Sequence, residues 1–113
     1  MHEMSLASGV IGLLEEAARR EGFSRVKTVW LEIGALACVE PEALAFCFES
    51  VARGSLAEGA GLEIVHRPGE GWCMPCGRTV ELAARFAECP VCGTGQVQVT
   101  GGEQMRVMEL SVE

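Results

Sequence analysis

Apolar residues recur at helical spacing in two segments of the chain. In the first segment they are separated by charged residues, at Leu6, Val10, Leu13, Leu14 and Ala17. Ser5 suits the N-cap and Gly22 suits the position just past the end, so the pattern predicts a helix over residues 5–21. In the second segment Pro41 suits the first helical position and Gly54 suits the end, which predicts a helix over residues 41–52.

Alternation of apolar and polar residues predicts strands over residues 26–36, 61–67 and 104–112. The sequence Pro68-Gly69-Glu70-Gly71 after the second strand predicts a break in regular structure. The cysteine-bearing segment beyond it, residues 71–95, offers the last strand little apolar surface. We therefore expect that strand to return to the sheet of the first two.

This order of elements predicts an α+β fold, a small mixed sheet with two helices plus an inserted zinc-ribbon-like module. We expect residues 1–67 and 103–113 to form the α+β domain and residues 68–102 to form the module. A chain of 113 residues suits one ordinary domain with a small insert. Apolar residues make up 49% of the chain but only six are aromatic, so the core is expected to be aliphatic.

The formal charge of −7 argues against binding to nucleic acid, which needs clustered Lys and Arg. The nine basic residues are scattered, and the densest cluster is Arg19-Arg20. The charge instead favours metal cations and basic protein surfaces as partners.

No segment has the pattern of a signal peptide or of a membrane span, which needs about 18 apolar residues. We therefore expect a soluble, cytoplasmic protein with no membrane partner. In that compartment six cysteines indicate metal ligands or buried thiols rather than disulfides.

Four of the cysteines form two CxxC motifs, Cys73-Met74-Pro75-Cys76-Gly77 and Cys89-Pro90-Val91-Cys92-Gly93, separated by twelve residues. Zinc prefers four tetrahedral ligands, and paired CxxC turns place two thiolates each on one ion. Glycine after each second cysteine tolerates the left-handed backbone of such a turn. The pattern therefore predicts a zinc site formed by Cys73, Cys76, Cys89 and Cys92.

Other interpretations of the two motifs are weaker. Two disulfides would need an oxidising compartment, and a redox-active CxxC would need one motif at the start of a thioredoxin-like helix. An iron site of the rubredoxin type uses the same four thiolates, and the sequence alone does not separate it from zinc, although the ligand-set rules favour zinc.

The predicted zinc site is closed, since protein ligands fill all four positions, and is therefore structural rather than catalytic. Four thiolates and one Zn²⁺ add −2 and take the formal charge from −7 to −9. Folding of the module is expected to depend on the metal, because its apolar residues are few. The main ones are Trp72, Val80, Leu82, Phe86 and Val91.

The chain begins Met1-His2-Glu3. The terminal amine, the amide nitrogen of His2 and the imidazole Nδ1 can close successive chelate rings, and such a planar nitrogen set suits Ni(II) or Cu(II). Glu3 can add its amide nitrogen or its carboxylate. Judged on these residues alone, a frayed terminal histidine is the simpler interpretation.

A family resemblance changes that judgement. The chain resembles the HypA/HybF family of hydrogenase nickel-insertion proteins over essentially its whole length. The resemblance rests on the double CxxC module and three further blocks, Met1-His2-Glu3-Met4-Ser5-Leu6-Ala7, Leu31-Glu32-Ile33-Gly34-Ala35-Leu36 and Val39-Glu40-Pro41-Glu42-Ala43-Leu44.

The resemblance implies a nickel metallochaperone that binds Ni(II) at the N-terminus for maturation of [NiFe]-hydrogenase. His2 would be the indispensable ligand, with Glu3 beside it, and zinc at the four cysteines would be structural. The terminal amine of Met1 is a nickel candidate from its chelate chemistry alone. The implied partners are a HypB-type GTPase, the hydrogenase large-subunit precursor and, in some organisms, urease accessory proteins. The donor that completes the nickel site and the oligomeric state stay open.

The remaining candidate residues receive structural interpretations. Cys38 and Cys47 are expected to be buried small apolar residues, and His66 lies on a predicted strand. With two histidines in the chain we find no catalytic constellation, so we do not expect an enzyme. A zinc-ribbon interaction module and a rubredoxin-like electron carrier are the alternative functions.

Overall fold

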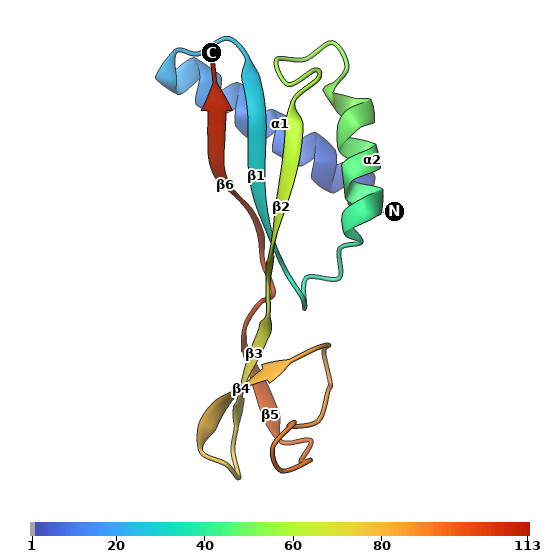
Figure 1. Ribbon diagram of the computed structural model, residues 1–113, viewed down its shortest axis with the longest axis vertical. Helices are drawn as coiled ribbons and strands as arrows, with labels where there is room; N and C mark the ends of the chain where they lie inside the picture. The colour runs from blue at the N-terminus through green and yellow to red at the C-terminus, as the bar shows by residue number, and fades with distance from the viewer. Residues whose placement is uncertain (1) are drawn as a thin grey trace. The chain divides into compact units, whose positions relative to one another are not determined.

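The computed structural model describes residues 2–113. It contains two helices and six strands: α1 (His2–Glu21), β1 (Val26–Gly34), α2 (Pro41–Ala52), β2 (Gly61–Arg67), β3 (Gly69–Cys73), β4 (Arg78–Leu82), β5 (Val97–Gly101) and β6 (Met105–Val112). The strands form two three-stranded sheets, ordered β2-β1-β6 and β4-β3-β5, here called sheet A and sheet B (Figure 1).

The α+β class is confirmed, and so is the return of the last strand, since β6 pairs with β1. The chain leaves sheet A after β2, forms sheet B and comes back. Neither helix within residues 2–113 has both the length and the apolar character needed to cross a membrane.

The chain divides into two compact units. Unit 1 comprises the segment ending at Leu31 together with Val39–Ile64 and Val107–Glu113, and unit 2 comprises Glu32–Cys38 and Val65–Arg106. The strands of sheet A contribute residues to both units, because the division falls within β1, β2 and β6.

The core of unit 1 is aliphatic, as composition predicts. Helix α1 lies across sheet A (Figure 1) and buries Ala7, Val10, Ile11 and Leu14. Helix α2 buries Leu44, Phe48 and Ala52, and β1 adds Val26, Val29 and Leu31. Gly22 ends α1 with a φ of +81° and an N–H that donates to the Ala18 carbonyl, which confirms its predicted role.

The predicted break over residues 68–71 is confined to Pro68, because β2 ends at Arg67 and β3 begins at Gly69. The two glycines of this segment serve close packing within sheet B rather than a turn. A Cβ at Gly69 would lie 2.5 Å from the Leu82 carbonyl oxygen, and one at Gly71 would lie 2.6 Å from the Val97 side chain. These positions therefore favour glycine for lack of space.

In unit 2, an ion-pair cluster joins the three strands of sheet A. The Nε atoms of Arg67 on β2 and Arg106 on β6 lie 2.9 and 3.1 Å from the two carboxylate oxygens of Glu32 on β1. The hydrogen bond from Arg67, followed by that from Arg106, lowers the pKa of Glu32. Each oxygen of this carboxylate is thus matched to one guanidinium.

Candidate metal centre

The first predicted zinc-binding turn lies between β3 and β4. The N–H of Cys76 donates to Sγ of Cys73 at 3.5 Å, and the N–H of Gly77 donates to the Cys73 carbonyl oxygen at 2.8 Å. Gly77 has a φ of +63°. Glycine adopts this left-handed conformation without a steric penalty, which allows the turn to close around its first sulfur.

The second turn repeats this arrangement before β5. The N–H of Cys92 donates to Sγ of Cys89 at 3.5 Å, the N–H of Gly93 donates to the Cys89 carbonyl oxygen at 2.8 Å, and Gly93 has a φ of +77°. Cys89 Sγ also accepts the N–H of Val91 at 3.4 Å. The glycine after each motif therefore has the role predicted from sequence.

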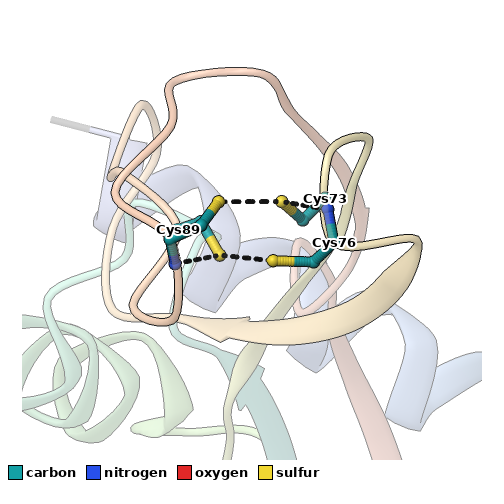
Figure 2. Close-up of side chains that lie close together, drawn as sticks. Cys73, Cys76 and Cys89 are labelled. Atoms are coloured by element: carbon teal, nitrogen blue, oxygen red, sulfur yellow. Dashed lines mark hydrogen bonds between the residues drawn. The ribbon is translucent and has the colours of Figure 1, made fainter.

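The sulfur atoms of the two turns converge, and Figure 2 shows the thiols of Cys73, Cys76 and Cys89 directed toward one another. All four Sγ atoms lie within 4.8 Å of one another, with Cys73 to Cys92 at 3.6 Å and Cys76 to Cys89 at 4.0 Å. Metal–sulfur bonds of about 2.3 Å in a tetrahedron place sulfurs about 3.8 Å apart, so the cluster fits zinc. A disulfide would need about 2.05 Å.

The electrostatics of the cluster favour a central cation. Hydrogen bonding with the neighbouring sulfurs, that of Cys92 first, raises the pKa of Cys76 to about 12. Burial raises the pKa of Cys73. The pKa of Cys89 instead falls to about 6, chiefly because the N–H of Cys92 donates to its sulfur. Four adjacent thiolates are thus unfavourable without a metal, and a divalent ion would offset their repulsion.

A small apolar cluster supports the turns. Leu36, Val80 and Leu82 are buried together with Cys73 and Cys89. Val80 and Leu82 are two of the five main apolar residues of the module. The backbone of Leu36 is fixed as well, because its N–H donates to the Gly102 carbonyl oxygen at 2.8 Å and its own carbonyl oxygen accepts from Arg85 Nε at 3.1 Å.

The other three main apolar residues of the module are exposed. Trp72 is 41% exposed, Val91 59% and Phe86 99%. Trp72 alternates onto the outer face of β3, while Val91 lies within the second turn, between its two cysteines. Phe86 has a φ of +65°, an unfavourable conformation for a bulky side chain. Few apolar side chains of the module are thus buried, and Cys73 and Cys89 take part in its small core.

At the start of the chain, Met1 lies outside the described residues, so its expected ligand role is not placed. The His2 side chain is 54% exposed, and its Nδ1 lies 4.0 Å from Oε1 of Glu3, whose side chain is only 18% exposed. Oε2 of Glu3 accepts the backbone N–H of Glu40 at 3.2 Å, and this bond is the largest of the effects that lower the Glu3 pKa. The structure thus brings the two described nickel candidates together.

The predicted N-cap at Ser5 is wrong, because α1 already begins at His2. Ser5 lies in the first turn instead. Glu3 stands in that turn as well, where a carboxylate interacts favourably with the helix dipole. The first N–H groups of a helix have no intrahelical acceptor, so the amides of His2 and Glu3 are not committed to the helix ladder.

The remaining cysteines and His66, which were given structural roles, lie outside the four-cysteine cluster and the start of α1. Cys47 is half-buried, but Cys38 is exposed with a φ of +59°, contrary to the expected burial. His66 is exposed on β2. Within residues 2–113, the one group of three or more side chains able to share a metal ion is that of Cys73, Cys76, Cys89 and Cys92.

Two contacts near the sites were not predicted. The Glu3–Glu40 hydrogen bond links residues 37 apart, and Arg85 reaches Leu36 across 49 positions while pairing with Glu103 at 2.7 Å. No local pattern signals such contacts. For Glu3, the only local signal was that it is an acidic residue near the start of a predicted helix.

Comparison with known proteins adds a family assignment to this geometry. The family model described as "Hydrogenase/urease nickel incorporation, metallochaperone, hypA" matches residues 1–112. The hydrogenase maturation factors HypA of Albidiferax ferrireducens and Dechloromonas aromatica are 60% and 59% identical to the chain over 113 residues, which is the full length of each protein.

A solved structure agrees with the fold. The solution structure of the Ni metallochaperone HypA from Helicobacter pylori superimposes with a TM-score of 0.72 at 29% sequence identity. The alignment covers 99% of this chain and 97% of that one.

Proposed function

The chain belongs to the HypA family of hydrogenase nickel metallochaperones, and from this premise we propose that it binds Ni(II) through its first residues and delivers it for maturation of [NiFe]-hydrogenase. The family is one of metallochaperones and not of enzymes. In this proposal nickel is cargo and zinc is a structural component. The chain must then hold one ion permanently and the other only for a time.

The two candidate sites differ in the way this division requires. The four thiolates would enclose an ion on all sides, and backbone hydrogen bonds fix the sulfurs of Cys73 and Cys89. Such a closed site suits an ion that stays. We therefore assign structural zinc to Cys73, Cys76, Cys89 and Cys92.

The observation that carries the nickel assignment is the start of α1 at His2. An exposed imidazole stands there beside amide nitrogens that the helix does not use, and these are the donors of the planar set that Ni(II) favours. We assign His2 as the essential ligand, Glu3 as its neighbour and the terminal amine of Met1 as a further donor. An exposed site of this kind suits an ion that must leave.

The proposal extends to organisation, partners and location. We assign nickel binding to residues 1–67 with 103–113, and zinc binding to residues 68–102. Hydrogenase maturation implies contact with other maturation components, and we propose a HypB-type GTPase and the large-subunit precursor, with urease accessory proteins as partners where urease is present. Four zinc thiolates require reduced cysteines, which supports a cytoplasmic location.

A nickel titration tests the central claim. We expect His2→Ala to reduce Ni(II) affinity at least tenfold, measured by calorimetry, while zinc content by elemental analysis stays at one ion per chain. His66→Ala is the matched control, because it removes the other exposed histidine, on β2. Equal nickel affinity in His2→Ala and wild type would refute the assignment, and so would an equal loss in both variants.

A further inference from the structure

The outer face of sheet B carries a tryptophan at its centre. Trp72 lies on the middle strand, β3, directly opposite Thr79 of β4 and Gln98 of β5. The inner face of the same sheet contributes to the apolar cluster that contains Cys73 and Cys89. The outer face is otherwise polar, as expected for an antiparallel sheet with one solvent-exposed side. A large apolar ring in the middle of that face is the exception.

Two acidic residues share this face. Glu70 of β3 lies directly opposite Glu81 of β4. Glu70 is two residues before Trp72 on β3, so both side chains are on the same face of the sheet. Like charges in opposed positions destabilise a sheet. Among residues 2–113 no Lys, Arg or His nitrogen lies within 4.0 Å of either carboxylate. Neither carboxylate therefore has a cation beside it in the described chain.

Glu70 also borders a cavity of about 360 Å³ within unit 2. Two further glutamates line this cavity, but both are already paired, Glu32 with two arginines and Glu103 with Arg85. The Glu70 carboxylate lies against Gly101, where an added Cβ would come within 2.9 Å of Oε1. Glu70 is thus the glutamate of this cavity that has no positive partner in the described chain.

We propose that the face formed by Glu70, Trp72 and Glu81, called the Trp72 face below, binds an arginine-bearing segment of a partner protein. A guanidinium stacks on the indole of Trp72 and pairs with the two carboxylates. Its planar fork matches a carboxylate and its weak hydration suits stacking, which favours arginine over lysine. Of the three residues of the Trp72 face only Glu70 lines the cavity, so the cavity extends this face on the Glu70 side alone.

The overall charge supports a basic partner. The formal charge of −7 attracts positively charged surfaces, and the Trp72 face combines unpaired carboxylates with an exposed aromatic ring. The Trp72 face contains no nickel-binding residue, so this inference stands apart from the delivery role proposed for the N-terminus. It identifies the surface through which unit 2 meets a protein partner.

Tryptophan fluorescence gives a direct test, since the chain has only two tryptophans. In the zinc-loaded full chain, Trp30→Phe leaves Trp72 as the sole reporter. This protein is titrated at low ionic strength with a glycine–serine peptide that carries arginines, and with the same peptide carrying citrulline, which keeps the shape and removes the charge. We expect the arginine peptide to change the emission with a Kd below about 1 mM and citrulline to have no effect.

Substitutions then locate the site. Glu70→Gln and Glu81→Gln should each raise the Kd about two- to fivefold, in line with exposed ion pairs. Glu63→Gln on β2 makes the same change in net charge at an exposed position outside unit 2 and should leave the Kd unchanged. Trp72→Thr should abolish binding, measured by calorimetry, with zinc content retained.

Three results would overturn the proposal. Equal binding of the citrulline peptide would show that the guanidinium charge is not recognised. An equal loss of affinity in Glu63→Gln would show that only net charge matters. No binding of the arginine peptide by fluorescence or calorimetry would remove the Trp72 face as a docking site. None of these results would alter nickel binding at His2, which is measured separately.

Discussion

A substitution at Gly34, where β1 ends, gives a sharp test of the packing in unit 2. A Cβ added there would lie 2.1 Å from the carbonyl oxygen of Gly102. Carbon–oxygen contacts are normally no shorter than about 3.3 Å, so backbone must move by about 1 Å. The displaced carbonyl is the one that accepts the N–H of Leu36, a residue of the apolar cluster beside the zinc thiols.

The expected magnitude follows from this geometry. Overpacking typically costs about 1–3 kcal/mol, and we expect Gly34→Ala to fall near 3 kcal/mol because the obstructing atom belongs to the backbone rather than to a flexible side chain. In a chain of 113 residues this corresponds to a decrease of about 10 °C in the midpoint of thermal unfolding. Zinc should also be released faster to a chelator, because Leu36 shifts.

Gly9→Ala provides the matched control. Gly9 is exposed in α1, and an added Cβ would meet nothing within 4 Å. The same substitution there should stabilise the helix by about 1 kcal/mol and raise the midpoint by about 4 °C. Thermal unfolding followed by circular dichroism and chelator-induced zinc release measure both effects. A Gly34→Ala protein as stable as wild type, with unchanged zinc release, would refute the close approach of the two backbone segments.

Three further predictions concern pH and the two metal sites. Because the pKa of Glu32 is lowered in the folded protein, its ion pairs contribute fully to stability above pH 4.5, the ordinary pKa, and this stability is lost as the pH falls through the folded-state pKa. Glu32→Gln should therefore flatten the fall of the thermal midpoint below pH 4.5, whereas Glu63→Gln should not. Cys89→Ser should abolish zinc retention and the near-ultraviolet circular dichroism of unit 2, whereas most of the helical signal should persist because both helices lie in unit 1. Retention of zinc by this variant would contradict the four-thiolate site. One residue added before Met1 should weaken Ni(II) binding about tenfold or more in calorimetry and leave zinc content unchanged, and an unaltered nickel affinity would remove the terminal amine from the site.

The elements with distinct start and stop residues were predictable from sequence. Helix α2 spans the predicted residues 41–52, because proline can begin a helix without losing a hydrogen bond and Gly54 supports a chain reversal after it. Strand β2 also matches its predicted limits. In these cases local preference and tertiary packing agree.

The strands of sheet B were not predicted from the sequence. Strand β3 contains Gly69 and Gly71, which read as turn residues but are required by the close approach of neighbouring strands. Strands β4 and β5 have five residues each and do alternate apolar and polar residues, but no strand was predicted there because the segment was interpreted through its CxxC motifs. The four clustered cysteines were identified from their spacing alone, since each CxxC turn is a local structure. The Glu3–Glu40 hydrogen bond depends on tertiary packing and had no local signal.

That hydrogen bond has a consequence for the thermodynamics of ion capture. It fixes the Glu3 carboxylate through Oε2, while Oε1 is the oxygen that lies 4.0 Å from the imidazole of His2. If Oε1 is a ligand of the proposed nickel site, the ion meets a pre-organised donor, and little side-chain rotamer entropy remains to be lost on binding. After release of the ion, the Glu40 N–H would still hold the carboxylate in the conformation that binds the next one.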